Sequence, residues 1–356
     1  MVDFDLLDDV CAANGSGDVF AVARLEDSLA ELTDFPYAVA VSSGTAAVAS
    51  LLWAVGVRPG HRVGVSALAR PETGLAVVAL GAEPMFLDTA PDDSFGLDTG
   101  EIEAAVEAGC TALVPVPMWG YWNEDAESLA RARAWGCHIV VDAAEAPFLL
   151  TSPRLGDQVD GMALSLHGST PLKAGEGGAS FTVYETVAAA VAALRSFGQG
   201  SAPRARHLEA SGPYGGAFGV NLRINGLGAA WCLDQVRRVT EVRRQLEQDR
   251  LVADFCFRRA RVPFVECHVA ASVTRHGLYG YAVVCADERD RARLSQRLID
   301  TGIEPDIGTS GHGLIFESQV FTDHRRPCPR AAALARRVVA VRNESLRTAV
   351  KRGLAA

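Results

Sequence analysis

Short apolar runs alternate with stretches of helical periodicity between residues 37 and 184. The apolar runs predict strands, and several are almost continuously hydrophobic, as buried parallel strands are. The predicted strands cover residues 37–43, 62–67, 83–88, 111–117, 138–144, 161–167 and 178–184. The predicted helices between them cover residues 45–56, 71–81, 101–109 and 125–136. This alternation predicts an α/β fold built on one large, mostly parallel sheet.

The second half of the chain has a different pattern, in which helices outnumber strands. Its predicted elements are a long helical stretch, a strand and two helices, at residues 226–261, 278–286, 288–300 and 329–341. We therefore predict a large α/β domain over residues 1–235, with the N-terminal segment included, and a smaller C-terminal α+β domain over residues 236–356. The Gly- and Pro-rich residues 199–218 are predicted to form a loop.

Charge and hydropathy narrow the classes of protein to consider. The formal net charge of −9 lacks the basic excess of a nucleic-acid surface, so no nucleic-acid partner is expected. No run of eighteen apolar residues is present, and the acidic N-terminus lacks the basic flank of a secretory signal. Eight scattered cysteines without a CxxC pair show no metal-ligand spacing. These features predict a cytoplasmic protein with a small-molecule partner, no metal and no membrane contact.

Two stretches place polar groups where a strand ends and a helix begins. In SSGTAA (42–47), backbone amides and the hydroxyls of Ser43 and Thr45 form a cup suited to a phosphate, although an ordinary helix cap has the same appearance. In VVDAAEA (140–146), Asp142 ends a hydrophobic strand, at the sheet edge where α/β proteins bind ligands. Its carboxylate would pair with a protonated ring nitrogen or cap a helix.

These two motifs occur in order with two others, the glycine-rich loop SLHGSTPLKAGEGGA (165–179) and GVNLRING (219–226). Taken together over residues 15–345, they resemble the DegT-type sugar aminotransferases, which are pyridoxal phosphate (PLP) enzymes of fold type I. The resemblance implies a PLP-transferase-like fold and a homodimer with shared active sites. It also implies PLP or pyridoxamine phosphate (PMP) as cofactor and a role in the biosynthesis of a sugar, cyclitol or secondary metabolite.

The resemblance assigns roles to five residues. Gly44, Thr45 and Ser165 would hold the cofactor phosphate. Asp142 would hold the pyridine nitrogen and keep it protonated, which makes the ring an electron sink. Asn221 would reach across the dimer interface to the phosphate in the partner's site.

Three positions depart from the family pattern. An ungapped match of the loop from Ser165 to its terminal glycines places Thr170 where the family has its Schiff-base lysine, with Lys173 three positions later. Arg70 stands where the family has an aromatic residue that stacks on the cofactor, and Glu145 stands where Gln is common. Both are still expected to contact the cofactor. Alternatively, Arg70 binds a carboxylate or phosphate of another ligand, or forms a surface ion pair.

The lysine count gives the first departure weight, because Lys173 and Lys351 are the chain's two lysines. A threonine hydroxyl cannot form a Schiff base. It also holds its proton too tightly to give the deprotonated form that would act as a base near neutral pH. The catalytic candidates are Thr170, Lys173 and His167, although the family often has a histidine at the position of His167.

Four interpretations follow, in order of preference. The cofactor is bound non-covalently as PLP or PMP. Alternatively, the protein is a cofactor-independent enzyme that uses the same pocket for its substrate. In the third interpretation Lys173 replaces the missing lysine, and in the fourth the chain is a non-catalytic dimer partner. We predict a diverged family member that is not a conventional lysine-dependent transaminase.

Overall fold

The computed structural model describes residues 17–152, 155–198, 218–267, 277–307 and 313–351. Its larger sheet has the strand order β1-β7-β6-β5-β4-β2-β3. The strands are β1 (Tyr37–Val41), β2 (Arg62–Ser66), β3 (Glu83–Leu87), β4 (Cys110–Val114), β5 (His138–Asp142), β6 (Gly161–Ser165) and β7 (Gly178–Thr182). All run parallel except β7, which is antiparallel to both of its neighbours. The seven predicted strands and the mostly parallel sheet are confirmed.

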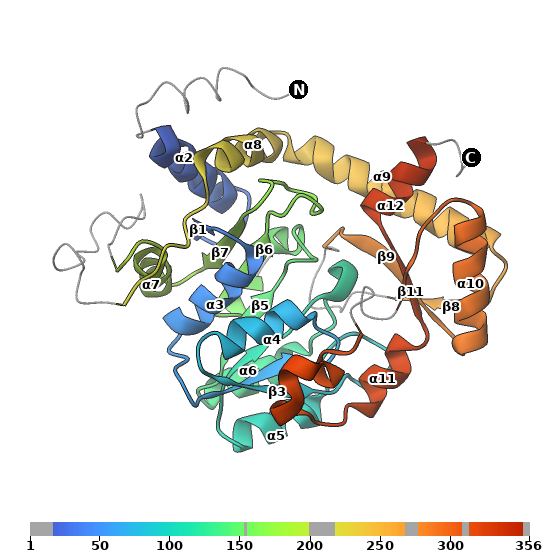
Figure 1. Ribbon diagram of the computed structural model, residues 1–356, viewed down its shortest axis with the longest axis horizontal. Coiled ribbons are helices and arrows are strands. Elements are labelled where there is room, and N and C mark those ends of the chain that lie inside the picture. The colour runs from blue at the N-terminus through green and yellow to red at the C-terminus, as the bar shows by residue number, and fades with distance from the viewer. Residues whose placement is uncertain (1–16, 153–154, 199–217, 268–276, 308–312, 352–356) are drawn as a thin grey trace.

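Helices cover both faces of this sheet (Figure 1). They are α2 (Gly17–Glu31), α3 (Gly44–Ala54), α4 (Pro71–Val78), α5 (Thr99–Glu107), α6 (Ala126–Ala134), α7 (Glu185–Arg195) and α8 (Gly226–Arg237). Successive residues of β5 point to opposite sides, since Val140 joins one core cluster while Ile139 and Val141 join the other. Burial on both faces explains why the strands are hydrophobic throughout. The four predicted helices in this region are confirmed, and α2 and α7 were not predicted.

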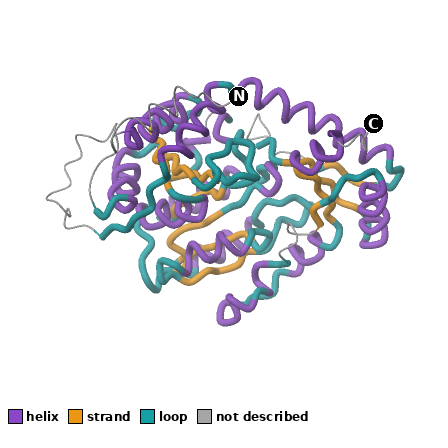
Figure 2. Tube along the Cα trace, turned by 45° about the horizontal axis from the view of Figure 1, so that its top comes forward, coloured by secondary structure: helices purple, strands orange, loops and turns teal. Residues whose placement is uncertain are grey.

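A second, antiparallel sheet has the strand order β10-β11-β9-β8. Its strands are β8 (Phe264–Glu266), β9 (Gly280–Cys285), β10 (Asp306–Ile307) and β11 (Val338–Arg342). Three helices pack with it, α9 (Val239–Arg259), α10 (Glu288–Asp300) and α12 (Asn343–Lys351). The long helix α9 runs from α8 to this sheet along the top of the molecule (Figure 2).

Two predictions for this part need correction. The helical stretch 226–261 is divided at Arg238, whose backbone (φ −105°, ψ 23°) ends α8 before α9 begins. The predicted helix 329–341 is wrong in its second half. Only α11 (Pro329–Ala335) is helical there, and Val338–Val341 pair with β9 as the buried strand β11. These β-branched residues gain more from sheet pairing than from continuing the helix. The predicted loop 199–218 lies outside the described residues except for Phe218.

Part of the predicted C-terminal domain packs against the larger sheet. This segment contains η5 (Ile315–Glu317), η6 (Gln319–His324) and α11, and it lies beside β3 and α4 (Figure 1). The ring of Phe321 packs edge-on against Phe86 of β3 at 5.3 Å, and the carboxylate of Asp88 accepts the amides of Arg330 and Ala331 at 3.1 and 2.7 Å. The division at residues 235 and 236 therefore stays a prediction.

A buried ion pair closes the outer edge of β1. The carboxylate of Glu26 accepts the amide of Ala40 at 2.8 Å, and Arg195 donates to the carbonyl of Ala40 at 2.6 Å and to Glu26. Both side chains are buried. Because an open sheet edge leaves backbone groups without partners, this pair satisfies the edge and fixes β1, which leads directly into α3.

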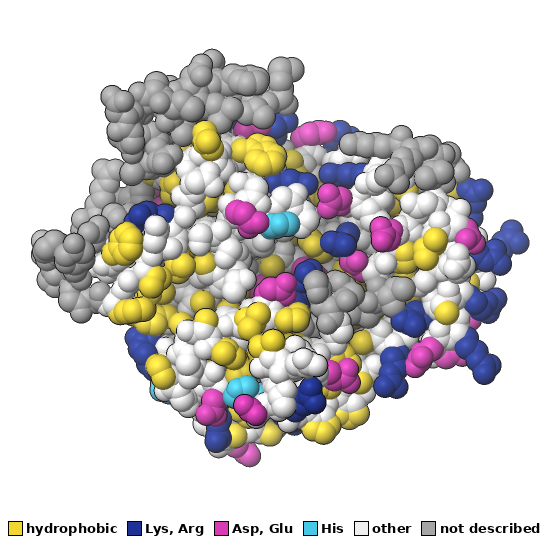
Figure 3. Space-filling model, viewed as in Figure 1, with side chains coloured by type: hydrophobic (Ala, Val, Ile, Leu, Met, Phe, Trp, Pro, Cys, Tyr) yellow, Lys and Arg dark blue, Asp and Glu magenta, His cyan; other side chains and the backbone are white. Residues whose placement is uncertain are grey.

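On the outer surface, basic and acidic side chains are interspersed. Figure 3 shows many Lys and Arg side chains over α10 at the right-hand edge, with Asp and Glu among them. Arg293, for example, pairs with Asp290 at 2.9 Å on α10. Among the described residues, none of the helices has the length and apolarity needed to cross a membrane.

Glu124 is a buried carboxyl group between η1 (Met118–Gly120) and α6. Its carboxylate accepts the amide of Leu97 at 3.1 Å. Burial raises the pKa of Glu124 from 4.5 to about 7, against the opposing effect of that hydrogen bond. The folded protein therefore binds this proton more tightly than the unfolded chain. The stability that protonated Glu124 contributes is fully present below its pKa in the unfolded chain. It is lost as the pH rises through its folded-state pKa of about 7.

We predict that Glu124→Gln raises the free energy of unfolding by about 3 kcal/mol at pH 8 and leaves it nearly unchanged at pH 4.5. The glutamine oxygen still accepts from Leu97 and carries no charge. Urea unfolding at the two pH values measures this. The exposed Glu107→Gln serves as the control, with a change below about 0.5 kcal/mol at either pH. An equal effect of Glu124→Gln at both pH values would contradict the assignment.

Candidate functional site

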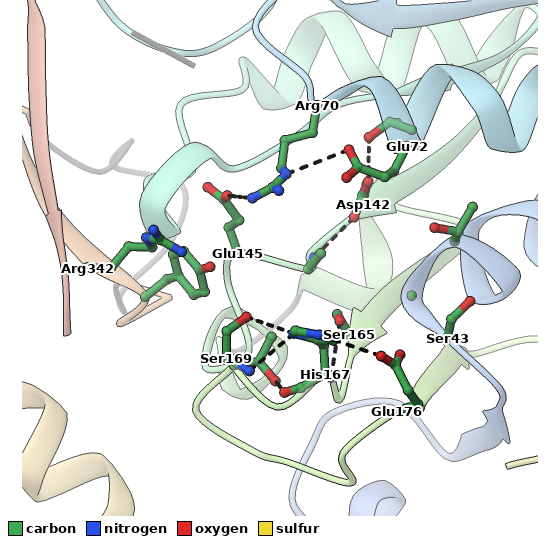
Figure 4. A pocket seen from close by; sticks show the side chains of 17 residues that line it. Ser43, Arg70, Glu72, Asp142, Glu145, Ser165, His167, Ser169, Glu176 and Arg342 are labelled. Atoms are coloured by element: carbon green, nitrogen blue, oxygen red, sulfur yellow. Dashed lines mark hydrogen bonds and ion pairs between the residues drawn. The ribbon is translucent and has the colours of Figure 1, made fainter. Parts of the chain in front are cut away.

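A cavity of about 520 Å³, here called the main cavity, lies at the carboxyl ends of β5 and β6 (Figure 4). Its walls come from strand ends, the starts of α3 and α4, the glycine-rich loop and the second sheet. The lining residues are Ser43, Gly44, Thr45, Arg70, Glu72, Thr73, Asp142, Ala144, Glu145, Ser165, His167, Ser169, Thr170, Glu176, Gly177, Tyr279 and Arg342. This is the sheet edge at which α/β proteins bind ligands.

The predicted phosphate cup lies at the start of α3. Ser43 caps the helix by accepting the amide of Ala46 at 3.1 Å, which leaves Gly44 and Thr45 in the first turn, where amides have no intrahelical acceptor. A Cβ atom on Gly44 would lie 3.0 Å from Cβ of Ser165, so the absence of a side chain lets the helix approach the end of β6. The structure thus brings Gly44, Thr45 and Ser165 together around one wall of the main cavity.

Asp142 is buried at the end of β5 with two hydrogen-bond donors. The hydroxyl of Thr73 donates to Oδ2 at 2.6 Å, and the amide of Ala144 donates to Oδ1 at 3.1 Å. Burial raises the pKa of Asp142 above the ordinary carboxyl value, and these two hydrogen bonds oppose that shift. Sequence reasoning missed Thr73, although its place in the first turn after β2 puts it at the same edge of the sheet.

Arg70 lies in the main cavity between two carboxylates. Its Nη1 atom is 3.5 Å from Oε1 of Glu145, and its Nε atom is 3.7 Å from Oε2 of Glu72. Glu145 is buried, and its other oxygen accepts the amide of Trp119 at 3.1 Å. Burial raises the pKa of Glu145, while Arg70 and the Trp119 amide oppose the shift.

Trp119 has an unfavourable backbone conformation. Its φ of 50° lies in the left-handed region, which a tryptophan rarely adopts. Such a strained conformation persists where the surrounding structure requires it. Here it places the amide of Trp119 within hydrogen-bonding distance of Glu145. Sequence reasoning missed this contact, because it depends on a backbone angle in another loop. Two carboxylates therefore hold Arg70, that of Glu145 after β5 and that of Glu72 in the first turn of α4.

Thr170 is buried, and its hydroxyl is engaged by its own loop. Its Oγ1 atom lies 2.8 Å from the carbonyl oxygen of His167 and 2.6 Å from that of Leu172. Both groups are acceptors, so the hydroxyl proton is directed at the backbone and away from a ligand. Thr170 lines the main cavity as predicted, but its hydroxyl closes the loop.

Lys173 is absent from the residues that line the main cavity, and so is any other lysine of the described chain. It lines a second pocket of about 230 Å³, here called the adjoining pocket, which is bounded by loop 169–173, Leu246, Tyr279 and residues within 342–348. Gln235 binds both the amide and the carbonyl of Lys173, at 3.1 and 2.8 Å. These two bonds hold the backbone of the loop at Lys173.

His167 belongs to a small polar cluster at the mouth of the main cavity. The amide of Ser169 donates to Nδ1 at 3.2 Å, and Oγ of Ser169 lies 2.8 Å from the same atom. Because Nδ1 accepts from an amide, the neutral ring carries its proton on Nε2, which lies 3.6 Å from Oε1 of Glu176. Sequence reasoning did not select Ser169 or Glu176 (Figure 4).

Asn221 does not line the main cavity of its own chain. It is exposed and forms an isolated antiparallel β-bridge with Ser196. Its side-chain oxygen accepts the amide of Arg223 at 3.3 Å. The prediction that Asn221 serves a partner's site is not tested within one chain.

Comparison with known proteins places this geometry in a family. The model of the DegT/DnrJ/EryC1/StrS aminotransferase family matches residues 13–346. The chain belongs to this family. Among its relatives, the spore coat polysaccharide biosynthesis protein SpsC of Bacillus subtilis is 27% identical over 294 residues, covering 82% of this chain and 75% of that protein. GDP-perosamine synthase of Caulobacter vibrioides is 29% identical over 265 residues, covering 74% and 68%.

Solved structures of other proteins share the fold. An aminotransferase from Psychrobacter cryohalolentis superposes with a TM-score of 0.79 at 19% identity, covering 99% of this chain and 96% of that one. NtdA from Bacillus subtilis, solved with bound cofactor PMP, gives 0.78 at 20% identity, covering 99% and 82%. The predicted fold class is confirmed as the α/β fold of PLP-dependent aminotransferases with its large, mostly parallel sheet.

The pairing of Arg70 with Glu145 yields a test. We predict that Arg70→Gln lowers the free energy of unfolding by roughly 2 kcal/mol, because it leaves the desolvated carboxylate of Glu145 without its partner. Glu145→Gln should lower it by less, because Arg70 keeps its contact with Glu72. The double variant should lose at least about 1 kcal/mol less than the sum of the two single changes. Urea unfolding of the four proteins completes the cycle.

The control is the exposed pair Arg62–Glu83, whose charged atoms lie 3.9 Å apart. Arg62→Gln should change stability by less than about 0.5 kcal/mol. Strict additivity of Arg70→Gln and Glu145→Gln would show that the two side chains are not coupled.

Proposed function

We propose that this chain is a diverged DegT-family enzyme that binds PLP or PMP without a covalent bond to lysine. The observation that carries the proposal is the composition of the main cavity. It keeps the phosphate cup at Gly44 and Thr45 and the buried carboxylate of Asp142, and none of its described lining residues is a lysine. Thr170 supplies a hydroxyl that is already engaged by the loop backbone.

The residues present fit such a cofactor at its two ends. The first-turn amides of α3 and the hydroxyls of Thr45 and Ser165 would hold the phosphate, since helix starts favour anions. The carboxylate of Asp142 would hold the pyridine nitrogen in its protonated form, and that positive charge would offset the burial that raises the pKa of Asp142. When bound, the cofactor supplies an electron sink for bonds at the carbon next to its amine.

Without a lysine, proton transfer falls to another group in the loop. We propose His167, whose ring lines the main cavity and whose tautomer is fixed by Ser169. In the neutral form Nε2 carries the proton and faces Glu176, so the ring would accept a proton at Nδ1, in place of the amide that Ser169 donates there. The carboxylate of Glu176 would then stabilise the charged ring. The role of Thr170 is then structural, since its hydroxyl donates to the carbonyl of His167 and closes the turn that positions this histidine.

The substrate class follows from the family, which contains the sugar aminotransferases of nucleotide-sugar biosynthesis. We propose a sugar or cyclitol as substrate, within a small-molecule biosynthetic pathway. A cofactor-independent enzyme is the second candidate. The observation that favours it is Arg70, which lies between Glu72 and Glu145 where an aromatic would stack on a cofactor ring. The placement of Lys173 in the adjoining pocket counts against a relocated lysine.

We further propose a homodimer in which Asn221 completes the partner's phosphate site. The residue is exposed in the single chain and far enough from its own main cavity to be absent from the lining. Light scattering at micromolar concentration should give twice the chain mass of 37.7 kDa. Asn221→Ala should weaken PLP binding about tenfold while the dimer persists, since one charge-assisted hydrogen bond is lost. A stable monomer would refute this part of the proposal.

Restoring the lysine tests the proposed function. We predict that Thr170→Lys lets borohydride fix PLP to the new lysine, because the phosphate cup and Asp142 still position the cofactor. Peptide mass mapping after reduction locates the added mass. Thr170→Ala controls for the lost hydroxyl, and Thr322→Lys introduces the same side chain at an exposed position in η6.

Neither control should gain specifically attached PLP, and Thr170→Ala should bind PLP as the wild-type protein does. If Thr170→Lys folds, as judged by circular dichroism, and still binds no PLP, the pocket is not a cofactor site. The cofactor-independent candidate would then be favoured.

A further inference from the structure

Two helix-to-strand turns on neighbouring strands end in the same dipeptide, a glycine followed by a cysteine. Cys110 is the first residue of β4, after α5, and Cys137 lies directly before β5, after α6. The preceding Gly109 and Gly136 have left-handed φ angles of 82° and 85°, which let the chain leave each helix and turn into the sheet. Both turns lie at the amino ends of the strands, whereas the main cavity lies at the carboxyl ends.

The register of the sheet brings the two cysteines close together. Strands β4 and β5 are parallel neighbours, and Ala112 pairs with His138. Cys137 therefore lies one residue along its strand from the position opposite Cys110. Since neighbouring strands are about 4.8 Å apart and successive residues rise about 3.3 Å, this diagonal corresponds to a Cα separation of about 6 Å. Disulfides span Cα separations of about 4.4 to 6.8 Å, so the placement suits a disulfide.

A β-bulge in β4 directs both side chains to the same face of the sheet. The pairing of β4 with β2 skips Thr111, which is the extra residue of the bulge. In a regular strand Cys110 and Ala112 would point to the same face. With the bulge, Cys110 joins the core cluster that contains Cys137, while Ala112 joins the other cluster.

The sulfur of Cys110 is surrounded by hydrogen-bond donors. It accepts the amide of Gly64 at 3.1 Å. A hydrogen bond from the thiol of Cys137 lowers the pKa of Cys110, in the same direction as the Gly64 amide and against the effect of burial. The same hydrogen bond, together with burial, raises the pKa of Cys137. The thiolate therefore forms first at Cys110, which makes Cys110 the nucleophile of the pair.

We propose that Cys110 and Cys137 form a reversible disulfide when the protein is exposed to a peroxide. Cys110 is 6% exposed and Cys137 is 2% exposed, each directly after an exposed glycine, so a small oxidant is the kind that reaches them. The bridge would join the turn after α5 to the turn after α6. It is independent of the proposed function, because neither cysteine lines the main cavity.

The oxidation has two steps that consume one peroxide. The thiolate of Cys110 attacks a peroxide oxygen, the O–O bond breaks, and the hydroxide that leaves takes up the proton lost by the thiol to give water. Cys110 is then a sulfenic acid. The sulfur of Cys137 attacks the sulfenic sulfur, the S–O bond breaks, and a second water leaves with the thiol proton. Two thiols are oxidised to one disulfide while the peroxide is reduced to two waters.

Peptide mass mapping of the wild-type protein tests this after treatment with hydrogen peroxide and alkylation under denaturing conditions. Trypsin cuts after Arg131 and Arg133, between the two cysteines, so a disulfide links two peptides that are otherwise separate. We expect the linked peptides in most molecules and an intact mass lower by that of two hydrogen atoms. Dithiothreitol should restore both free thiols.

Three variants assign the roles of the two thiols. Cys137→Ser lacks the second thiol, so Cys110 should accumulate sulfenic acid that dimedone traps. In Cys110→Ser, Cys137 should gain no dimedone at the same peroxide concentration. Cys232→Ser is the matched control, because Cys232 is buried in α8 and burial raises its pKa to about 12. It should leave the linked peptides unchanged.

The wild-type measurement does not depend on whether a variant folds, which circular dichroism checks. Free thiols at Cys110 and Cys137 after the peroxide treatment would overturn the proposal. So would a link from either residue to a third cysteine, or a stable sulfinic acid at Cys110 in the wild-type protein. A Cys110–Cys137 link that forms in urea and not in the folded protein would also overturn it, since the sheet register would then have no part.

Discussion

The buried carboxylate of Asp142 is the constraint around which the site is arranged. A carboxylate removed from water needs donors, and it receives them from the Thr73 hydroxyl on α4 and the Ala144 amide after β5. The bond to Thr73 ties the start of α4 to the end of β5, and Arg70 is the residue that begins this helix. Arg70 is thereby set opposite Glu145. Two donors do not remove the penalty of burial, which still raises the pKa of Asp142, so a cationic ring nitrogen would complete the charge balance.

The glycine-rich loop is held by hydrogen bonds to its backbone. Thr170 directs its hydroxyl at two carbonyls of its own turn. Three residues later, Gln235 binds the backbone of Lys173, which lines the adjoining pocket. Hydrogen bonds within the chain hold this loop. Under the proposed function, the fold keeps the groups for the two ends of a cofactor, and the chemistry depends on loop side chains such as His167.

The sequence predicted the strands, the parallel sheet and the two motifs at its edge because these depend on local periodicity and on the shared direction of parallel strands. The order of motifs also singled out Thr170 and Arg70, which line the main cavity and whose roles stay predictions. It could not predict that Val338–Val341 form a strand, since that depends on pairing with β9. Nor could it find Thr73 as the partner of Asp142 or the left-handed Trp119 beneath Glu145, because both contacts join segments distant in the chain. The backbone of Lys173 is likewise held by Gln235, which lies 62 residues away in the chain.

The central claim, a cofactor held without a covalent bond, is tested most directly by the intact mass of the wild-type protein. The protein is equilibrated with PLP, the bound fraction is measured by dialysis, and a second portion is reduced with borohydride before mass spectrometry. The account predicts retention of PLP in dialysis and no specific mass increase after reduction. A stoichiometric increase that maps to the peptide containing Lys173 would contradict it.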